Sequence, residues 1–195
     1  MPIYASAGSG TKFAPAPAGT HAAVCCDVRD LGILETSWQG ETKRQHKILI
    51  SWQIDEPRDD GKPFLVSRRY TLSLHEKAGL RKDLESWRGR AFSDAELHQF
   101  DVEAVVGKGC LLNVVHRTSG GDTYANVNGV MALPKGMPAP TVRDYVRFVD
   151  RKPDDHAAHI DDPPEHPPIT DDDIPFAWLL PLMVPVIAGS MAVLA

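Results

Sequence analysis

The feature that most constrains the fold is a change of hydrophobic period along residues 20–133. Three stretches, 21–34, 43–55 and 64–74, alternate apolar and polar side chains with a period of two, which is typical of half-buried β-strands. Residues 75–88 place apolar side chains at helical spacing, and the period of two returns in 110–118 and 123–133. We therefore predict the element order strand, strand, strand, helix, strand, strand.

The strand at 43–55 shows the alternation most clearly. Its apolar face carries Ile48, Ile50, Trp52 and Ile54, and its other face carries Lys47, Leu49, Ser51 and Gln53. We expect Trp52 and Tyr70 in the core. In the first strand, Val24, Cys26 and Val28 alternate with Cys25, Asp27 and Arg29. Turn formers separate the strands at 56–63 and 119–122, and Ser93 with Glu96 predicts the capping box of a short second helix.

Five strands with a helix between the third and the fourth is the order of the OB-fold, a small Greek-key barrel. Other small β-barrels and α+β sheets share parts of this order. The expected fold class is mainly β: a five-stranded OB-fold-like barrel with a helix between strands 3 and 4, plus a disordered acidic tail.

Composition divides the chain into four parts. Residues 1–19 are rich in Gly, Ala, Ser and Pro and are expected to be a flexible leader. Residues 20–150 form the predicted OB-fold-like domain, and their last part, 142–149, is an amphipathic piece that could pack back on the body. Residues 151–176 are a Pro-rich acidic linker and tip that we expect to be disordered, and 177–195 are an apolar extension.

Charge is distributed unevenly along the chain. Residues 1–152 hold all 21 Lys and Arg and 18 of the 26 acids, a net charge of +3, whereas 153–195 hold 8 acids and no Lys or Arg. A basic body can meet phosphates, while the acidic tail is repelled by them or competes for the same groove.

Single-strand binding requires cations for phosphates and exposed aromatic rings on which bases stack. The OB-fold binding surface is the face of strands 2 and 3 with the loops that join strands 1–2 and 4–5. Trp38 lies in the first of these loops as a stacking platform, or alternatively folds back as a plug of the barrel. The predicted nucleic-acid-binding residues are Trp38, Lys43, Arg44, Lys47, Arg58, Lys62, Arg68, Arg69, Arg117 and Tyr124.

The acidic tail carries the sextet Asp171-Asp172-Asp173-Ile174-Pro175-Phe176. This sextet, placed after a basic body and a Pro-rich linker, resembles the acidic tip of single-stranded DNA-binding proteins (SSBs). Residues 74–90 and 124–127 also look like segments of small phage and prophage proteins, which favours a phage-type member. The resemblance implies non-catalytic, largely sequence-independent binding of single-stranded DNA in replication, recombination or repair. It also implies that the sextet recruits partner proteins, and it allows a homo-oligomer.

The sequence departs from the SSB pattern after the tip. In that family the Phe is the last residue and its free carboxylate is gripped by the partner, but here nineteen residues follow Phe176. They are largely apolar and uncharged, and reach the length of a membrane-spanning helix, although they contain Pro181 and Pro185. They could anchor the chain in a membrane, pack on a partner or on the chain itself, or be a late-added extension.

Nothing in the sequence favours catalysis. No P-loop, GxSxG or HExxH motif is present, and we predict no enzyme, no cofactor and no metal site. The acids and histidines of residues 156–166 lie in a Pro-rich segment with no core to fix a coordination geometry. Three sparse cysteines fit buried thiols in a reducing cytoplasm, and no signal peptide is visible. The alternatives are a replication or recombination accessory protein that binds other proteins first, and a tail-anchored protein with a cytosolic β domain.

Overall fold

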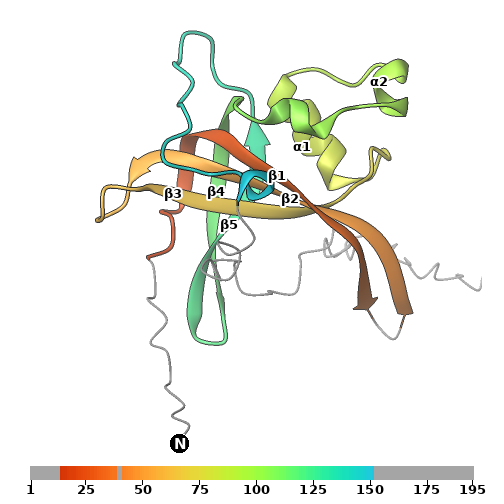
Figure 1. Ribbon diagram of the computed structural model, residues 1–195, viewed down its shortest axis with the longest axis horizontal. Coiled ribbons are helices and arrows are strands. Elements are labelled where there is room, and N and C mark those ends of the chain that lie inside the picture. Colours follow the sequence, from red (N-terminus) through yellow and green to blue (C-terminus); the bar gives the residue numbers. More distant parts are fainter. Residues whose placement is uncertain (1–13, 39–40, 152–195) are drawn as a thin grey trace, which may run out of the picture.

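The computed structural model describes residues 14–38 and 41–151, with the side chains of 36–41 excluded. Five strands and two helices follow in the predicted order (Figure 1). The strands are β1 (Gly19–Trp38), β2 (Glu41–Pro57), β3 (Pro63–Thr71), β4 (Gly109–Ser119) and β5 (Asp122–Met131). Between β3 and β4 lie α1 (Gly79–Arg88), α2 (Asp94–His98) and the 3-10 turn η1 (Val102–Val105), and a last 3-10 turn, η2, spans Phe148–Asp150.

All five strands belong to one antiparallel sheet of order β3-β2-β1-β4-β5. The long strand β1 joins its two halves, because its residues 19–24 pair with β4 and its residues 23–38 pair with β2. The sheet curls until its edge strands β3 and β5 come together, where Arg68 Nη1 donates to the Asn128 carbonyl at 3.2 Å. The predictions of a mainly β fold and of a helix between the third and fourth strands are confirmed.

Bulges in β1 change which side chains face the core. The register shifts between Cys25 and Asp27, so that Cys26 is the extra residue. Ala23, Cys25 and Val28 therefore belong to the core, and the predicted alternation of Val24, Cys26 and Val28 against Cys25 was wrong. The alternation of apolar and polar residues in the sequence does not show where a strand contains an extra, bulged residue.

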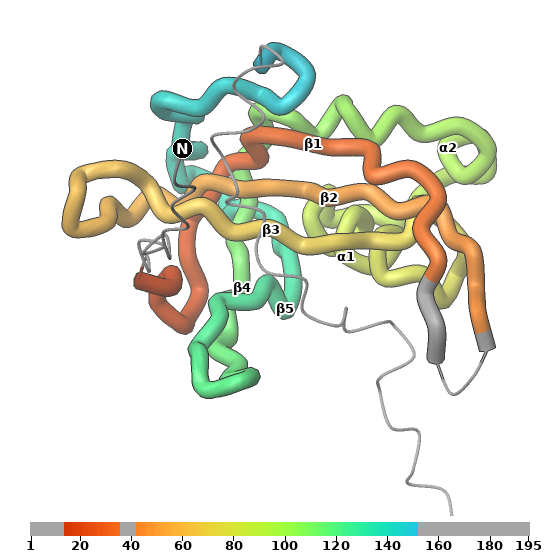
Figure 2. Tube along the Cα trace, turned by 60° about the horizontal axis from the view of Figure 1, so that its bottom comes forward, coloured from red at the N-terminus to blue at the C-terminus, as the bar shows by residue number. Residues whose placement is uncertain are grey.

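The core is made of side chains from the inner side of the sheet and from α1. The helix α1 packs against β3 and β5 (Figure 2). Trp52 is fully buried and its ring lies 6.1 Å from that of Trp87, centroid to centroid, at an interplanar angle of 54°. Leu80 and Leu84 complete the buried side of α1, and Tyr70 is buried on β3. The core positions expected for Trp52 and Tyr70 are thus confirmed.

Local signals placed most turns and helix ends correctly. Gly120 and Gly121 both adopt positive φ, which a two-residue hairpin turn requires and which glycine adopts without strain. Ser93 and Glu96 form the predicted capping box of α2. The first helix, however, begins at Gly79 instead of at residue 75, since His75 and Ala78 form a turn closed by the Ala78 N–H and the His75 carbonyl.

Two further segments meet the body. Of the leader predicted at 1–19, Ala16 is buried in the core cluster, and its carbonyl lies 2.7 Å from His116 Nε2. The piece predicted at 142–149 also packs back on the sheet, as described below. Within residues 14–38 and 41–151, no helix has the length and apolar character to cross a membrane.

Candidate nucleic-acid interface

The side of the sheet that faces away from the core is called the outer face here. On β1 to β3 it consists of cross-strand rows fixed by the register. One row is Arg29, Leu49 and Arg69, the next is Asp27, Ser51 and Ser67, and a third contains Lys47 and Thr71. Beyond the pair of Gly32 and Lys47, β1 and β2 continue away from the core as a two-stranded arm, residues 33–38 and 41–46 (Figures 1 and 2).

Residues 143–151, called the strap, cross this outer face. Figure 1 shows η2, the centre of the strap, lying against β1. Gln53 holds the start of the strap through both ends of its amide. Its Nε2 donates to the Arg143 carbonyl at 2.7 Å, and its Oε1 accepts from the Arg143 N–H at 2.9 Å. The strap thereby buries the outer-face side chain of Gln53.

Asp27 is the main anchor of the strap. Its side chain is buried in the middle of the outer face, and its carboxylate accepts three hydrogen bonds, all from the strap. The Phe148 N–H donates at 2.8 Å, the Tyr145 hydroxyl at 3.0 Å and Arg147 Nε at 3.5 Å. A buried carboxylate needs such donors, because burying a charge without partners costs several kcal/mol (~3–5 when one partner of a buried pair is removed).

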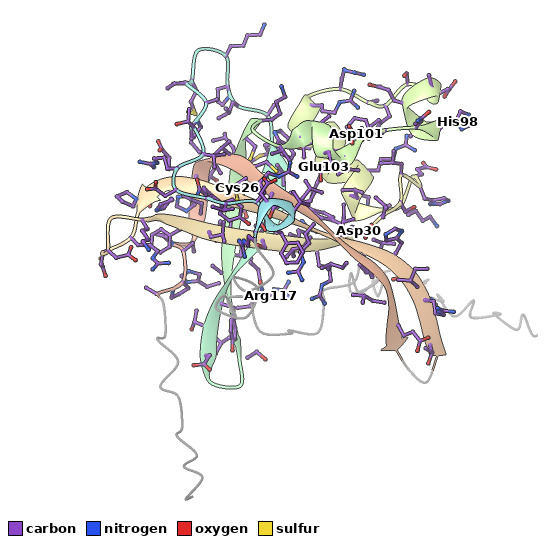
Figure 3. All side chains as sticks on the ribbon, viewed as in Figure 1. Cys26, Asp30, His98, Asp101, Glu103 and Arg117 are labelled. Carbon is purple, nitrogen blue, oxygen red and sulfur yellow. The ribbon has the colours of Figure 1, made fainter. Side chains whose placement is uncertain are left out.

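The strap adds arginines to the outer face. Arg147 also pairs with Glu103 of η1, and Arg143 Nη2 lies 3.1 Å from Asp55 Oδ1 (Glu103 is labelled in Figure 3). The guanidinium carbon of Arg29 lies 3.8 Å from the centroid of the Phe148 ring, a cation–π contact between β1 and the strap.

Lys43, Lys47 and Arg69 share the outer face, as the alternation of β2 and β3 requires. Lys43 is exposed on the arm and Arg69 is half-buried. Lys47 is only 5% exposed and its ammonium donates to Thr71 Oγ1 at 2.7 Å. The three cations that the sequence placed together therefore do share a face, but one of them is buried in it.

Arg44 and Arg68 point to the opposite side of the sheet. Arg44 lies 3.4 Å from Glu35 on the arm, and both side chains are exposed. Arg68 donates to Asp83 of α1 at 2.8 Å and stacks over the Tyr70 ring. The structure thus separates these two arginines from Lys43 and Arg69.

The remaining predicted residues lie in the hairpins and beyond the described chain. Arg58 and Lys62 lie at the β2–β3 turn, where the Arg58 guanidinium donates to Asp60 at 2.6 Å. Arg117 and Tyr124 face each other across β4 and β5, near the end of a hairpin that projects separately from the arm (Figures 2 and 3). Trp38 ends β1, but its side chain lies outside the described residues, as do Asp171, Asp172, Asp173, Ile174, Pro175 and Phe176.

Three thiols lie buried in the sheet: Cys25 and Cys26 on β1, and Cys110 on β4 opposite Ala23. Burial raises the pKa of Cys25 to about 12 and raises the pKa of Cys26 and Cys110 strongly as well. Cys26 is not part of the core cluster and lies near the strap, whose Arg151 lowers its pKa slightly against the effect of burial. Figure 3 labels it on β1. Thiols in such surroundings are poor nucleophiles.

Sequence reasoning missed Asp27, Arg29, Tyr145 and Phe148 as parts of one surface. The available signals were an acid within the apolar run of residues 22–28 and two aromatic rings in the short segment 142–149. Neither signal indicates which residues will be in contact, because the contacting residues are separated by 118 or more positions in the chain.

No protein-family model matches the chain, and no curated protein matches it significantly.

Proposed function

We propose that this chain binds single-stranded DNA without catalysis, through the outer face and the two projecting hairpins of an OB-fold-like domain. The proposal includes a role in replication, recombination or repair, in the manner of a phage-type SSB. It would act in the cytoplasm, where its substrate is found.

The sheet topology is the observation that carries this proposal. In the order β3-β2-β1-β4-β5, β1 is shared by both halves, the edges β3 and β5 meet, and the helices follow β3. This is the arrangement expected of a Greek-key barrel of the OB type, whose strand 2–3 face and loops 1–2 and 4–5 bind oligonucleotides. In the proposed OB-fold, the arm and the β4–β5 hairpin correspond to those two loops.

The charge of the outer face supports phosphate binding. Lys43, Arg69 and the strap arginines lie on it, whereas its acid Asp27 is buried and neutralised by strap donors. Asp55 is paired with Arg143. The strap also carries the exposed acids Asp144 and Asp150, so the charge of the outer face is mixed. Its cations Lys43 and Arg69 are the residues proposed to contact phosphates.

The sextet Asp171–Phe176 is proposed to recruit replication or repair proteins through its acids and its Ile-Pro-Phe surface. A pull-down with the chain cut after Phe176, compared with the full chain, tests whether the nineteen residues that follow mask the tip. Stronger capture of a partner by the cut chain would mean that the Phe176 carboxylate is required. Equal capture would mean that the side chains suffice.

A second candidate function is an accessory protein that acts mainly through protein contacts. The observation that favours it is the row of exposed valines on and beside the strap: Val142, Val146 and Val149 are 39%, 59% and 64% exposed. Apolar side chains gathered at a surface favour protein binding. A membrane anchor at 177–195 is a third proposal, tested by membrane fractionation with and without those residues.

A titration of labelled oligo-dT with the full chain, at about 50 mM salt where phosphate contacts are weakly screened, tests the main proposal. Binding that prefers the single strand to a duplex of equal length is expected. An absence of binding under these conditions would contradict single-strand binding and leave the protein-contact function as the better account.

A further inference from the structure

The strap makes too many hydrogen bonds with the sheet to be a cover that a ligand displaces. Removing it would leave the Asp27 carboxylate without the three donors that it receives from the strap, and the Gln53 amide without both of its partners. It would also expose an acid in the middle of the surface proposed to bind a polyanion. Both effects oppose displacement, so the strap is a permanent part of the outer face.

In that position the strap presents an aromatic ring beside the basic row. Phe148 is half-buried, and the Arg29 guanidinium stacks on it at 3.8 Å. Arg29 shares its cross-strand row with Leu49 and Arg69. A ring and a stacked guanidinium next to a second arginine offer a flat surface for a base and a charge for the phosphate that follows it.

We propose that Phe148 and Arg29 together form a base-stacking platform of the single-strand site, so that the strap contributes to binding instead of blocking it. This inference rests on the proposed function. It assigns a ligand-binding role to a segment that lies after the five-stranded sheet in the chain and that resembles no stacking motif.

The test uses the full chain and labelled oligo-dT. Phe148→Leu retains apolar bulk but removes the π face, and should weaken binding by about 5- to 150-fold, the range of one lost base stack. The salt dependence of binding should stay unchanged, because no charge is lost. Phe148→Trp should restore binding. The matched control is Val149→Ala, an exposed neighbour on the strap, which should bind as wild type.

The reactivity of Cys26 reports whether the strap stays in place. This thiol is 1% exposed in the structure and lies near the strap. It should remain unreactive toward a maleimide in the Phe148→Leu variant, which shows that the variant is folded, and also when oligo-dT saturates the wild type.

Three results would overturn the inference in distinguishable ways. Equal affinity of Phe148→Leu and wild type for oligo-dT would exclude the stacking platform but not the proposed function. Tighter binding by the variant, with Cys26 becoming reactive when oligonucleotide binds, would show that the strap covers the site. If the wild-type protein binds no oligonucleotide, both the proposed function and the stacking platform are excluded.

Discussion

The Tyr145 hydroxyl donates a hydrogen bond to the Asp27 carboxylate at 3.0 Å, although 118 residues separate them. This contact joins the last described segment of the chain to the middle of β1. It buries the acid and defines which part of the outer face stays open. Burial raises the pKa of Tyr145, and Cys26 and Asp27 raise it further, so the hydroxyl remains a donor through the neutral range.

Asp27→Ala should detach the strap and destabilise the fold by about 3 kcal/mol, since a buried carboxylate with three donors is lost and those donors are left without it. Urea unfolding at neutral pH measures the change. Asp30→Asn is the matched control on the same strand: Asp30 is exposed, so the loss of its ion pair with His46 should change stability little. Equal stabilities of the two variants would show that Asp27 does not anchor the strap.

Trp87→Ala should destabilise the domain by about 3–5 kcal/mol, because it opens a cavity against the Trp52 ring. It also removes the hydrogen bond from Trp87 Nε1 to the Gly109 carbonyl. Trp87→Phe keeps most of the packing and should lose clearly less. Thermal unfolding of both variants measures the two losses of stability. A larger loss for Trp87→Phe than for Trp87→Ala would show that packing of Trp87 against Trp52 does not stabilise the core.

Glu96 should make the domain more stable at neutral pH than in acid. Hydrogen bonds from Arg90, and then from the Ser93 N–H, hold the pKa of Glu96 well below its usual range. A carboxyl with a lowered folded pKa contributes stability above its unfolded pKa, about 4.3, and this contribution is lost as the pH falls from there toward the folded pKa.

Glu96→Gln keeps the capping geometry but removes the charge, so its stability should decline less than that of wild type between pH 5 and pH 3. Urea midpoints at several pH values measure the difference. Parallel curves for the two proteins would mean that Glu96 is not linked to folding.

The three cysteines should react slowly in the native protein and at once in denaturant, because all are buried and their thiols have raised pKa values. Counting thiols with a colorimetric disulfide reagent measures this. In Asp27→Ala, one thiol, Cys26, should become reactive without denaturant. Release of all three at the same rate would indicate global unfolding instead of strap opening.

The sequence predicted the order of the elements because each element is specified locally. Alternation marks β2 and β3, glycines mark the turn at 120–121, and Ser93 with Glu96 marks the start of α2. The bulge at Cys26 and the strap could not be predicted in the same way, since both depend on contacts with distant segments.

The candidate site was predicted in part. Lys43 and Arg69 share a face because side chains alternate along a strand, and the same rule sends Arg44 and Arg68 to the other side. Grouping these residues by charge alone placed all four together. Lys47 is buried against Thr71. Its burial depends on the segments that pack on the outer face, and the alternation of side chains along β2 does not reveal these segments.

The outer face is proposed to bind phosphates, and two neighbouring residues on β2 allow the most direct test. Lys43 lies on the outer face and Arg44 on the opposite one, both exposed on the arm. Affinity of the full chain for oligo-dT should be measured over a range of salt concentrations for wild type, Lys43→Gln and Arg44→Gln. We expect Lys43→Gln to bind more weakly and to reduce the salt slope by about 0.7–1, one phosphate contact, while Arg44→Gln follows wild type. Equal slopes for Lys43→Gln and wild type, or a loss confined to Arg44→Gln, would contradict the account.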